Sequence, residues 1–308
     1  MRSFIAVFAL IFAAVIATPV KATEFSLQVM KPVTVTMFTG DLAGNVYAVN
    51  GSQVSVLYTF EAKSTEIPVS VRRIAHRVRV DGRLELIVLT DDERWVALVL
   101  NQARTKIVET RGPFEAQGEE ALLVTNQMVQ TGGEDYRQLV DYDRRSGVVQ
   151  SSASLERVIG MARFGRDMFA LQRGVGLVLV PQGDVEQAQV FGNVHGTAMA
   201  IARSGRMVFV LHGSWGDTPG GIEVVDARTG ETKWTLKSVM ANTLGLPYGR
   251  VLGFSADSSA VYLLSYQGNT TQIITIPYVK NDEGQGYFEY PAVVAESSTI
   301  LCGLDIVR

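Results

Sequence analysis

Residues 196–236 contain four short strand-like runs in succession, GTAMAIA (196–202), MVFVLH (207–212), GIEVVD (221–226) and TKWTL (232–236). The first two are joined by the polar turn RSGR (203–206), the last two by ARTGE (227–231), and a glycine-rich loop separates the pairs. Short apolar runs bounded by glycine and polar residues are typical of β-strands, and tight connections make them antiparallel neighbours. The segment therefore predicts a four-stranded meander, the shape of one blade of a β-propeller.

Five weaker copies of this unit extend over most of the remaining chain, and helical periodicity is nearly absent after the N-terminus. Equivalent points in the six units fall at Tyr47, Val96, Leu139, Leu177, Val224 and Ile274. Their spacings, 38 to 50 residues, match the roughly 40–50 residues of a propeller blade. We predict an all-β propeller of six blades, closed by pairing of N- and C-terminal strands. Seven blades is the alternative, with one assembled from the end segments 25–30 and 300–307.

Two segments resemble known repeats. Residues 40–49, GDLAGNVYAV, resemble the strand–turn–strand core of PQQ-like propeller repeats. Residues 222–234, with their Asp-Ala-Arg-Thr-Gly-Glu turn, are similar both to those repeats and to YVTN-type, WD40-like repeats. The resemblance covers about six units and implies an architecture only, because enzymes, electron-transfer proteins and assembly scaffolds all use such repeats.

The first 22 residues have the pattern of a secretory signal peptide. A positive start (1–3) precedes an uncharged apolar run (4–17) and a segment with small residues before a cut after Ala22. We predict a single propeller domain, 23–308, that is secreted or lies in the secretory-pathway lumen, or in the periplasm if the host is bacterial, with no membrane span after cleavage. The alternative is an uncleaved N-terminal anchor. Asn50 and Asn269 lie in sequons that matter if the host glycosylates.

The charge of the chain limits the classes of partner that it can bind, and its cysteine content limits the disulfides that it can form. The chain is 308 residues long, 19% charged, with a formal net charge of −3 and no long basic tract, which argues against a nucleic-acid partner. Residues 71–80 are locally basic; a solvated strand face balanced by Asp81 and Glu85 is favoured over an anion or acidic-partner patch. The single cysteine, Cys302, excludes an intramolecular disulfide and is expected to be buried in a strand.

The candidate site residues are His195, His212, Trp215 and Asp217. His195 precedes the first strand of the 196–236 unit, His212 ends its second strand, and the loop that follows carries the other two. All four are expected on the rim formed by second-to-third-strand loops and blade-to-blade connections, the usual ligand face of a propeller. They form either a pocket with imidazole chemistry or a glycine-rich surface loop whose histidines bond to backbone. Because no metal-ligand spacing is present, we expect no metal and no cofactor.

Four other acidic residues are predicted to have a structural role rather than a catalytic one. Asp91, Asp92, Glu93 and Asp257 are expected in first-to-second-strand turns, on the opposite rim, as turn formers. The predicted inner strands are mainly Val, Ala, Met and Gly, which argues against a metal-dependent propeller hydrolase. The favoured function is therefore an exported module that binds a protein or extracellular ligand. The alternative is a small hydrolase or lyase that uses His195 and His212, and a third is a cofactor-free redox partner resembling the propeller subunits of amine dehydrogenases.

Overall fold

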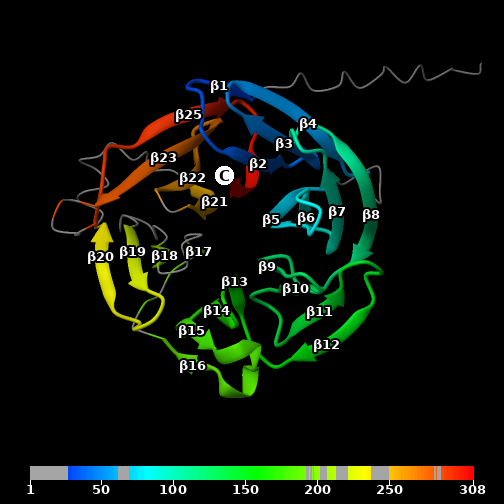
Figure 1. Cartoon of the computed structure of the whole chain (residues 1–308), viewed down its shortest axis with the longest axis vertical. Coiled ribbons are helices and arrows are strands. Elements are labelled where there is room, and N and C mark those ends of the chain that lie inside the picture. The colour runs from blue at the N-terminus through cyan, green and yellow to red at the C-terminus, as the bar shows by residue number, and fades with distance from the viewer. Residues whose placement is uncertain are drawn as a thin grey trace, which may run out of the picture.

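The computed structural model describes residues 27–61, 69–191, 194, 196, 198–201, 207–212, 221–236, 250–257, 259–280, 282 and 286–308. These residues form six sheets arranged as a ring around a central axis, the six-bladed β-propeller that the repeats predict (Figure 1). The predicted signal peptide (1–22) and the start of the predicted domain lie outside the described residues. No helix among the described residues is long and apolar enough to cross a membrane.

Each blade has four antiparallel strands, counted from the axis outward. The inner strands are β26 (Leu301–Val307), β5 (Val71–Val78), β9 (Ala121–Val124), β13 (Val158–Phe164), β17 (Ala198–Ile201) and β21 (Arg250–Ala256). The second strands are β2 (Thr36–Asp41), β6 (Leu84–Thr90), β10 (Met128–Gly132), β14 (Asp167–Gln172), β18 (Met207–His212) and β22 (Ala260–Gln267). The third strands are β3 (Asn45–Asn50), β7 (Arg94–Leu100), β11 (Leu139–Asp143), β15 (Gly176–Val180), β19 (Gly221–Asp226) and β23 (Thr270–Lys280). The outer strands are β4 (Gln53–Thr59), β8 (Ile107–Glu115), β12 (Val149–Ala153), β16 (Gln189–Val190), β20 (Thr232–Leu236) and β25 (Ala292–Ser297).

Three smaller elements lie outside the four-stranded pattern of the blades. β24 (Gly286–Phe288) pairs with β23, and the short helices η1 (Pro181–Gly183) and η2 (Val185–Gln187) connect β15 to β16. We call the end of the ring with the second-to-third-strand turns and blade-to-blade connections the upper rim. The end with the first-to-second and third-to-fourth turns is the lower rim.

The two ends of the chain close the ring. C-terminal β26 supplies the inner strand of the first blade and pairs with β2 from Thr36↔Val307 to Asp41↔Leu301, which confirms the predicted pairing of N- and C-terminal strands. N-terminal β1 (Gln28–Val29) instead joins the outer edge of the last blade, on β25. The two end segments therefore lie in different sheets, and the alternative of a seventh blade built from them is wrong.

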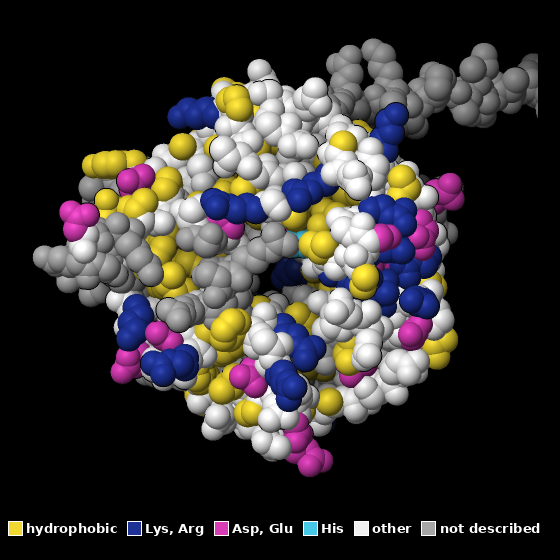
Figure 2. Space-filling view, viewed as in Figure 1, with side chains coloured by type: hydrophobic (Ala, Val, Ile, Leu, Met, Phe, Trp, Pro, Cys, Tyr) yellow, Lys and Arg dark blue, Asp and Glu magenta, His cyan; other side chains and the backbone are white. Residues whose placement is uncertain are grey.

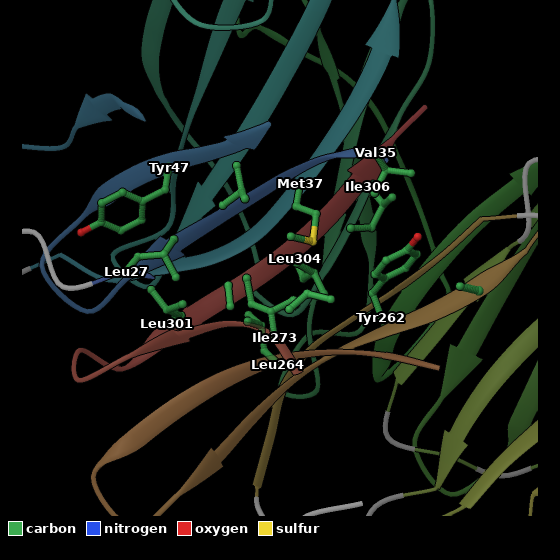
Figure 3. Packing of buried hydrophobic residues seen from close by; sticks show 14 residues of the cluster. Leu27, Val35, Met37, Tyr47, Tyr262, Leu264, Ile273, Leu301, Leu304 and Ile306 are labelled. Carbon is green, nitrogen blue, oxygen red and sulfur yellow. The ribbon is translucent and has the colours of Figure 1, made fainter. Parts of the chain in front are cut away.

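Apolar side chains fill the interfaces between blades rather than one central core. In β6, Leu86 and Val88 pack toward the first blade, whereas Ile87 and Leu89 pack toward the third. Successive side chains of a strand point to opposite faces, so a strand covered on both faces is apolar throughout. Figure 3 shows the interface that joins the two ends of the chain: Leu304 and Ile306 of β26 lie beside Tyr262 and other buried residues of the last blade.

Candidate functional site: the central channel

The inner strands of all six blades line a cavity on the axis of the ring. Its volume is about 320 Å³, and its lining includes residues of β26, β5, β9, β13, β17 and β21. Figure 2 shows the molecule hollowed at this position. The volume lies at the lower end of the range of small-molecule sites, which are typically about 300–1,000 Å³.

A histidine–aspartate pair spans two of these inner strands. Nδ1 of His76 in β5 lies 2.6 Å from Oδ2 of Asp305 in β26. Both groups line the cavity, and their side chains keep 17% and 13% of their exposure. The carboxylate fixes the orientation of the ring by binding Nδ1, so Nε2 is the nitrogen able to meet a ligand. The pair therefore offers a positioned hydrogen-bonding group in the channel wall.

Two further polar contacts join neighbouring blades along the same wall. Nε of Arg73 donates to the backbone oxygen of Glu120 at 2.6 Å, and Nε of Arg308 lies 3.0 Å from Oδ2 of Asp257. Burial raises the pKa of the Asp257 carboxyl, but hydrogen bonds from Ser259 and the charge of Arg308 outweigh it, so its pKa is lowered. Asp257 therefore stays ionised at the lower end of the channel.

The wall contributed by the fourth and fifth blades is apolar. It consists of Ile159, Met161 and Ala162 of β13 and Met199 and Ala200 of β17. Met199 lies close against the neighbouring strand, because a Cβ added at Gly160 would come within 2.9 Å of its Cγ. Methionine side chains adapt to irregular apolar ligands. The channel thus has a polar wall and an apolar wall that face the same space.

Three of the four predicted site residues, His195, Trp215 and Asp217, lie outside the described residues. Of His212 the backbone is described: it ends β18 opposite Gly221, at the upper rim, as predicted. The cluster around His195 and His212 stays a prediction. His76 and Asp305 are not among the predicted site residues; they lie 229 residues apart in the sequence. The predicted closure of the ring could have indicated this pair. If the C-terminal strand is the inner strand of the first blade, Asp305 lies beside the inner strand of the second blade, which carries His76.

The acidic turns follow the prediction only in part. Asp257 lies between β21 and β22, in a first-to-second-strand turn, as expected. The prediction for Asp91, Asp92 and Glu93 was wrong: they lie between β6 and β7, the second and third strands, and so on the upper rim. The reason is that the apolar run 86–89 has the pattern of a first strand, but the basic segment β5 precedes it and makes it the second strand of its blade. Among the described residues no three His, Cys, Asp or Glu side chains are grouped to hold a metal ion.

One side-chain prediction is confirmed and a second is confirmed only in part. Cys302 is buried, and burial raises the pKa of its thiol to about 11. Asp81 and Glu85 do balance the basic segment 71–80, through Arg79 and Arg77 respectively. That strand is not a solvated face, however, because the side chain of Arg77 is mostly buried against the third blade.

Comparisons with known proteins agree on the architecture. No family model and no curated protein matches the chain. A protein of unknown function from Bacteroides caccae matches with 10% identity and a TM-score of 0.54, covering 90% of this chain and 99% of that one. The WD40 propeller domain of Doa1 matches with 12% identity and a TM-score of 0.51, covering 92% and 97%. BamB from Moraxella catarrhalis is 14% identical over 89% of this chain and 79% of its own, with a TM-score of 0.44. The likeness is one of fold.

Proposed function

We propose that this propeller is an exported binding module that recognises its ligand in the central channel. The observation that carries the proposal is the channel itself, about 320 Å³ with a polar wall opposite an apolar wall. A ligand with an apolar body and one polar or charged group matches both walls. Small-molecule sites commonly combine apolar lining with a few placed polar groups.

The fold supports binding by keeping these groups in place. His76 and Asp305 are on inner strands that pair along their length with β6 and β2. A ring closed by β-pairing holds its central strands with little freedom, and a preorganised site loses less entropy when it binds. The extracellular ligand, whether a small molecule or a segment of a partner protein, then meets a site that is already formed.

Export is testable at the N-terminus. Secreted protein should begin at Thr23, because the residues before it carry the pattern that signal peptidase recognises. N-terminal sequencing of protein recovered outside the cytoplasm checks this. A matched variant, Ala22→Leu, puts a large residue at the cleavage position and should accumulate as the longer form. Recovery of full-length wild-type protein, with residues 1–22 still attached, contradicts cleavage.

Ligand recognition is testable with channel variants. Native mass spectrometry with a set of carboxylic acids and amines that carry apolar tails identifies ligands of the wild-type protein. We expect the affinity of these ligands to fall by about tenfold or more in His76→Gln and in Met199→Trp. The first change removes the imidazole from the polar wall, and the second fills space at the apolar wall. Tyr290→Ser, at an exposed position away from the channel, is the control. Equal affinity in all three variants contradicts binding in the channel.

The rival proposal, a hydrolase or lyase that uses His195 and His212, draws on one observation. Leu211, the residue before His212 in β18, lines the same channel. The variant His195→Ala/His212→Ala distinguishes the two. In an enzyme of this kind it abolishes turnover, whereas in a binding module it leaves the affinity of the channel ligand within about twofold.

A further inference from the structure

A row of charged side chains crosses the second blade on the face that meets the third. Backbone pairing places Arg77 of β5 opposite Glu85 of β6, Glu85 opposite Val99 of β7, and Val99 opposite Glu109 of β8. Residues directly opposite in a sheet point to the same face. Because of the register of the sheet, Arg77, Glu85 and Glu109 therefore point to one surface, with Val99 between the two glutamates.

Glu85 is the fully buried member of this row, and three arginines share its carboxylate. Arg77 donates to it from Nε at 2.6 Å, and Arg144, from the turn between β11 and β12, donates from Nη1 to both oxygens at 2.7 and 2.8 Å. Arg111 of β8 donates a further hydrogen bond to the same carboxylate. Burial raises the pKa of Glu85, but the three guanidinium groups outweigh this and lower it. The single negative charge of Glu85 is thus surrounded by the positive charges of Arg77, Arg111 and Arg144, at a site that is largely shielded from water.

The charges continue outward to the lower rim. Nη1 of Arg79 donates to Glu109 at 2.9 Å, and Arg83 donates to Oδ2 of Asp81 from Nε and Nη2 at 2.9 and 2.7 Å. The side chains of Arg79 and Arg83 are 24% and 38% exposed. We call Arg77, Arg79, Arg83, Arg111 and Arg144 the arginine patch. Lys and Arg side chains gather over β5–β8 in Figure 2.

The arginine patch holds more positive charge than its own carboxylates neutralise. Five guanidinium groups meet three carboxylates, those of Asp81, Glu85 and Glu109, among the described residues. Arginine donates several hydrogen bonds to one carboxylate: Arg83 donates from two nitrogens to Oδ2 of Asp81, and Arg144 donates from Nη1 to both oxygens of Glu85. The patch therefore binds carboxylates, and its ion pairs leave two positive charges in excess, one of which the carboxylate of Asp143 beside Arg144 offsets.

We propose that the arginine patch docks an acidic segment of a partner protein. This rests on the proposed binding role of the propeller, but not on its channel. A short carboxylate-rich segment contacts the patch alone, within the Debye length of about 10 Å at 0.1 M salt. A long nucleic acid or an anionic membrane also meets the rest of a chain whose net charge is −3, so it is the poorer occupant.

The test measures binding of a fluorescent peptide of alternating glutamate and serine by anisotropy. Wild-type protein should bind it, with affinity falling about tenfold between about 50 and 200 mM NaCl. Arg79→Gln/Arg83→Gln removes the two most exposed members of the patch, both from the first-to-second turn of the second blade, and should weaken binding about tenfold. The matched control, Arg163→Gln/Arg166→Gln, removes the same charge from exposed residues at the equivalent turn of the fourth blade and should change affinity less than about twofold.

Three results overturn the proposal. The first is that the wild type does not bind the peptide, and the second is that both double variants weaken binding equally. The third is that anionic vesicles or single-stranded DNA bind through Arg79 and Arg83 more tightly than the peptide does. Unchanged thermal melts of both double variants exclude loss of folding as the cause. His76→Gln, which tests the channel, should leave peptide binding unchanged. A failure of the docking proposal is thereby distinguished from a failure of the channel proposal.

Discussion

A chain that ends before β26 should not form a stable, soluble propeller. β26 is the inner strand of the first blade, so its loss opens the ring and exposes the inner edge of β2. It also removes four buried aliphatic side chains, Leu301, Leu304, Ile306 and Val307. At about 1.5–3 kcal/mol each, these contribute roughly 6–12 kcal/mol. Because the whole stability of a domain is about 5–15 kcal/mol, this one strand decides whether the ring folds.

Size-exclusion chromatography and thermal melts check this expectation on a chain that lacks residues 301–308. The matched control begins at Lys31 and lacks β1, which makes only two backbone pairs with β25. It should fold, with a melting temperature lowered by several degrees. A synthetic peptide of residues 300–308 should restore a cooperative melt to the shortened chain, because the missing strand binds the open edge. A monodisperse shortened chain that melts near the full-length temperature contradicts this account of closure.

The sequence predicted the blades well because the third strand of each blade carries the strongest signal. All six equivalent points, Tyr47, Val96, Leu139, Leu177, Val224 and Ile274, fall in third strands. Such strands are paired on both sides and covered on both faces, so they are apolar runs bounded by turn residues. That combination is readable locally, without knowledge of distant contacts.

The inner strands were harder to predict, and the candidate site lies on them. β5 carries Arg72, Arg73, His76 and Arg77, so the apolar run of β6 was mistaken for the first strand of that blade. β5 is polar where it borders the channel, unlike the apolar inner strands β13 and β17. Register shifts add to the difficulty: β5 is irregular between Val71 and Arg73, so simple alternation along the sequence does not tell which face His76 takes.

Glu85→Gln should lower the free energy of unfolding by about 3–5 kcal/mol, because it leaves three buried or half-buried arginines without their shared carboxylate. For a domain of this size that corresponds to a fall in melting temperature of about 10 °C. Glu109→Gln is the control: its carboxylate also binds arginines of the patch but is exposed, so about 1 kcal/mol or less is expected. Thermal melts of the three proteins at neutral pH make the comparison.

The stabilisation by Glu85 should also depend on pH, in a direction set by the lowered pKa of its carboxyl group. The pKa of Glu85 is lower in the folded protein, so its contribution is fully present above the unfolded value of about 4.3 and is lost as pH falls through the folded value. The difference between wild type and Glu85→Gln should therefore shrink in acid, below about pH 4. If Glu85→Gln costs as little as Glu109→Gln at neutral pH, solvent rather than Glu85 holds the arginines in place. The arginine patch would then be flexible, and its surplus charge would not be fixed in position for a partner.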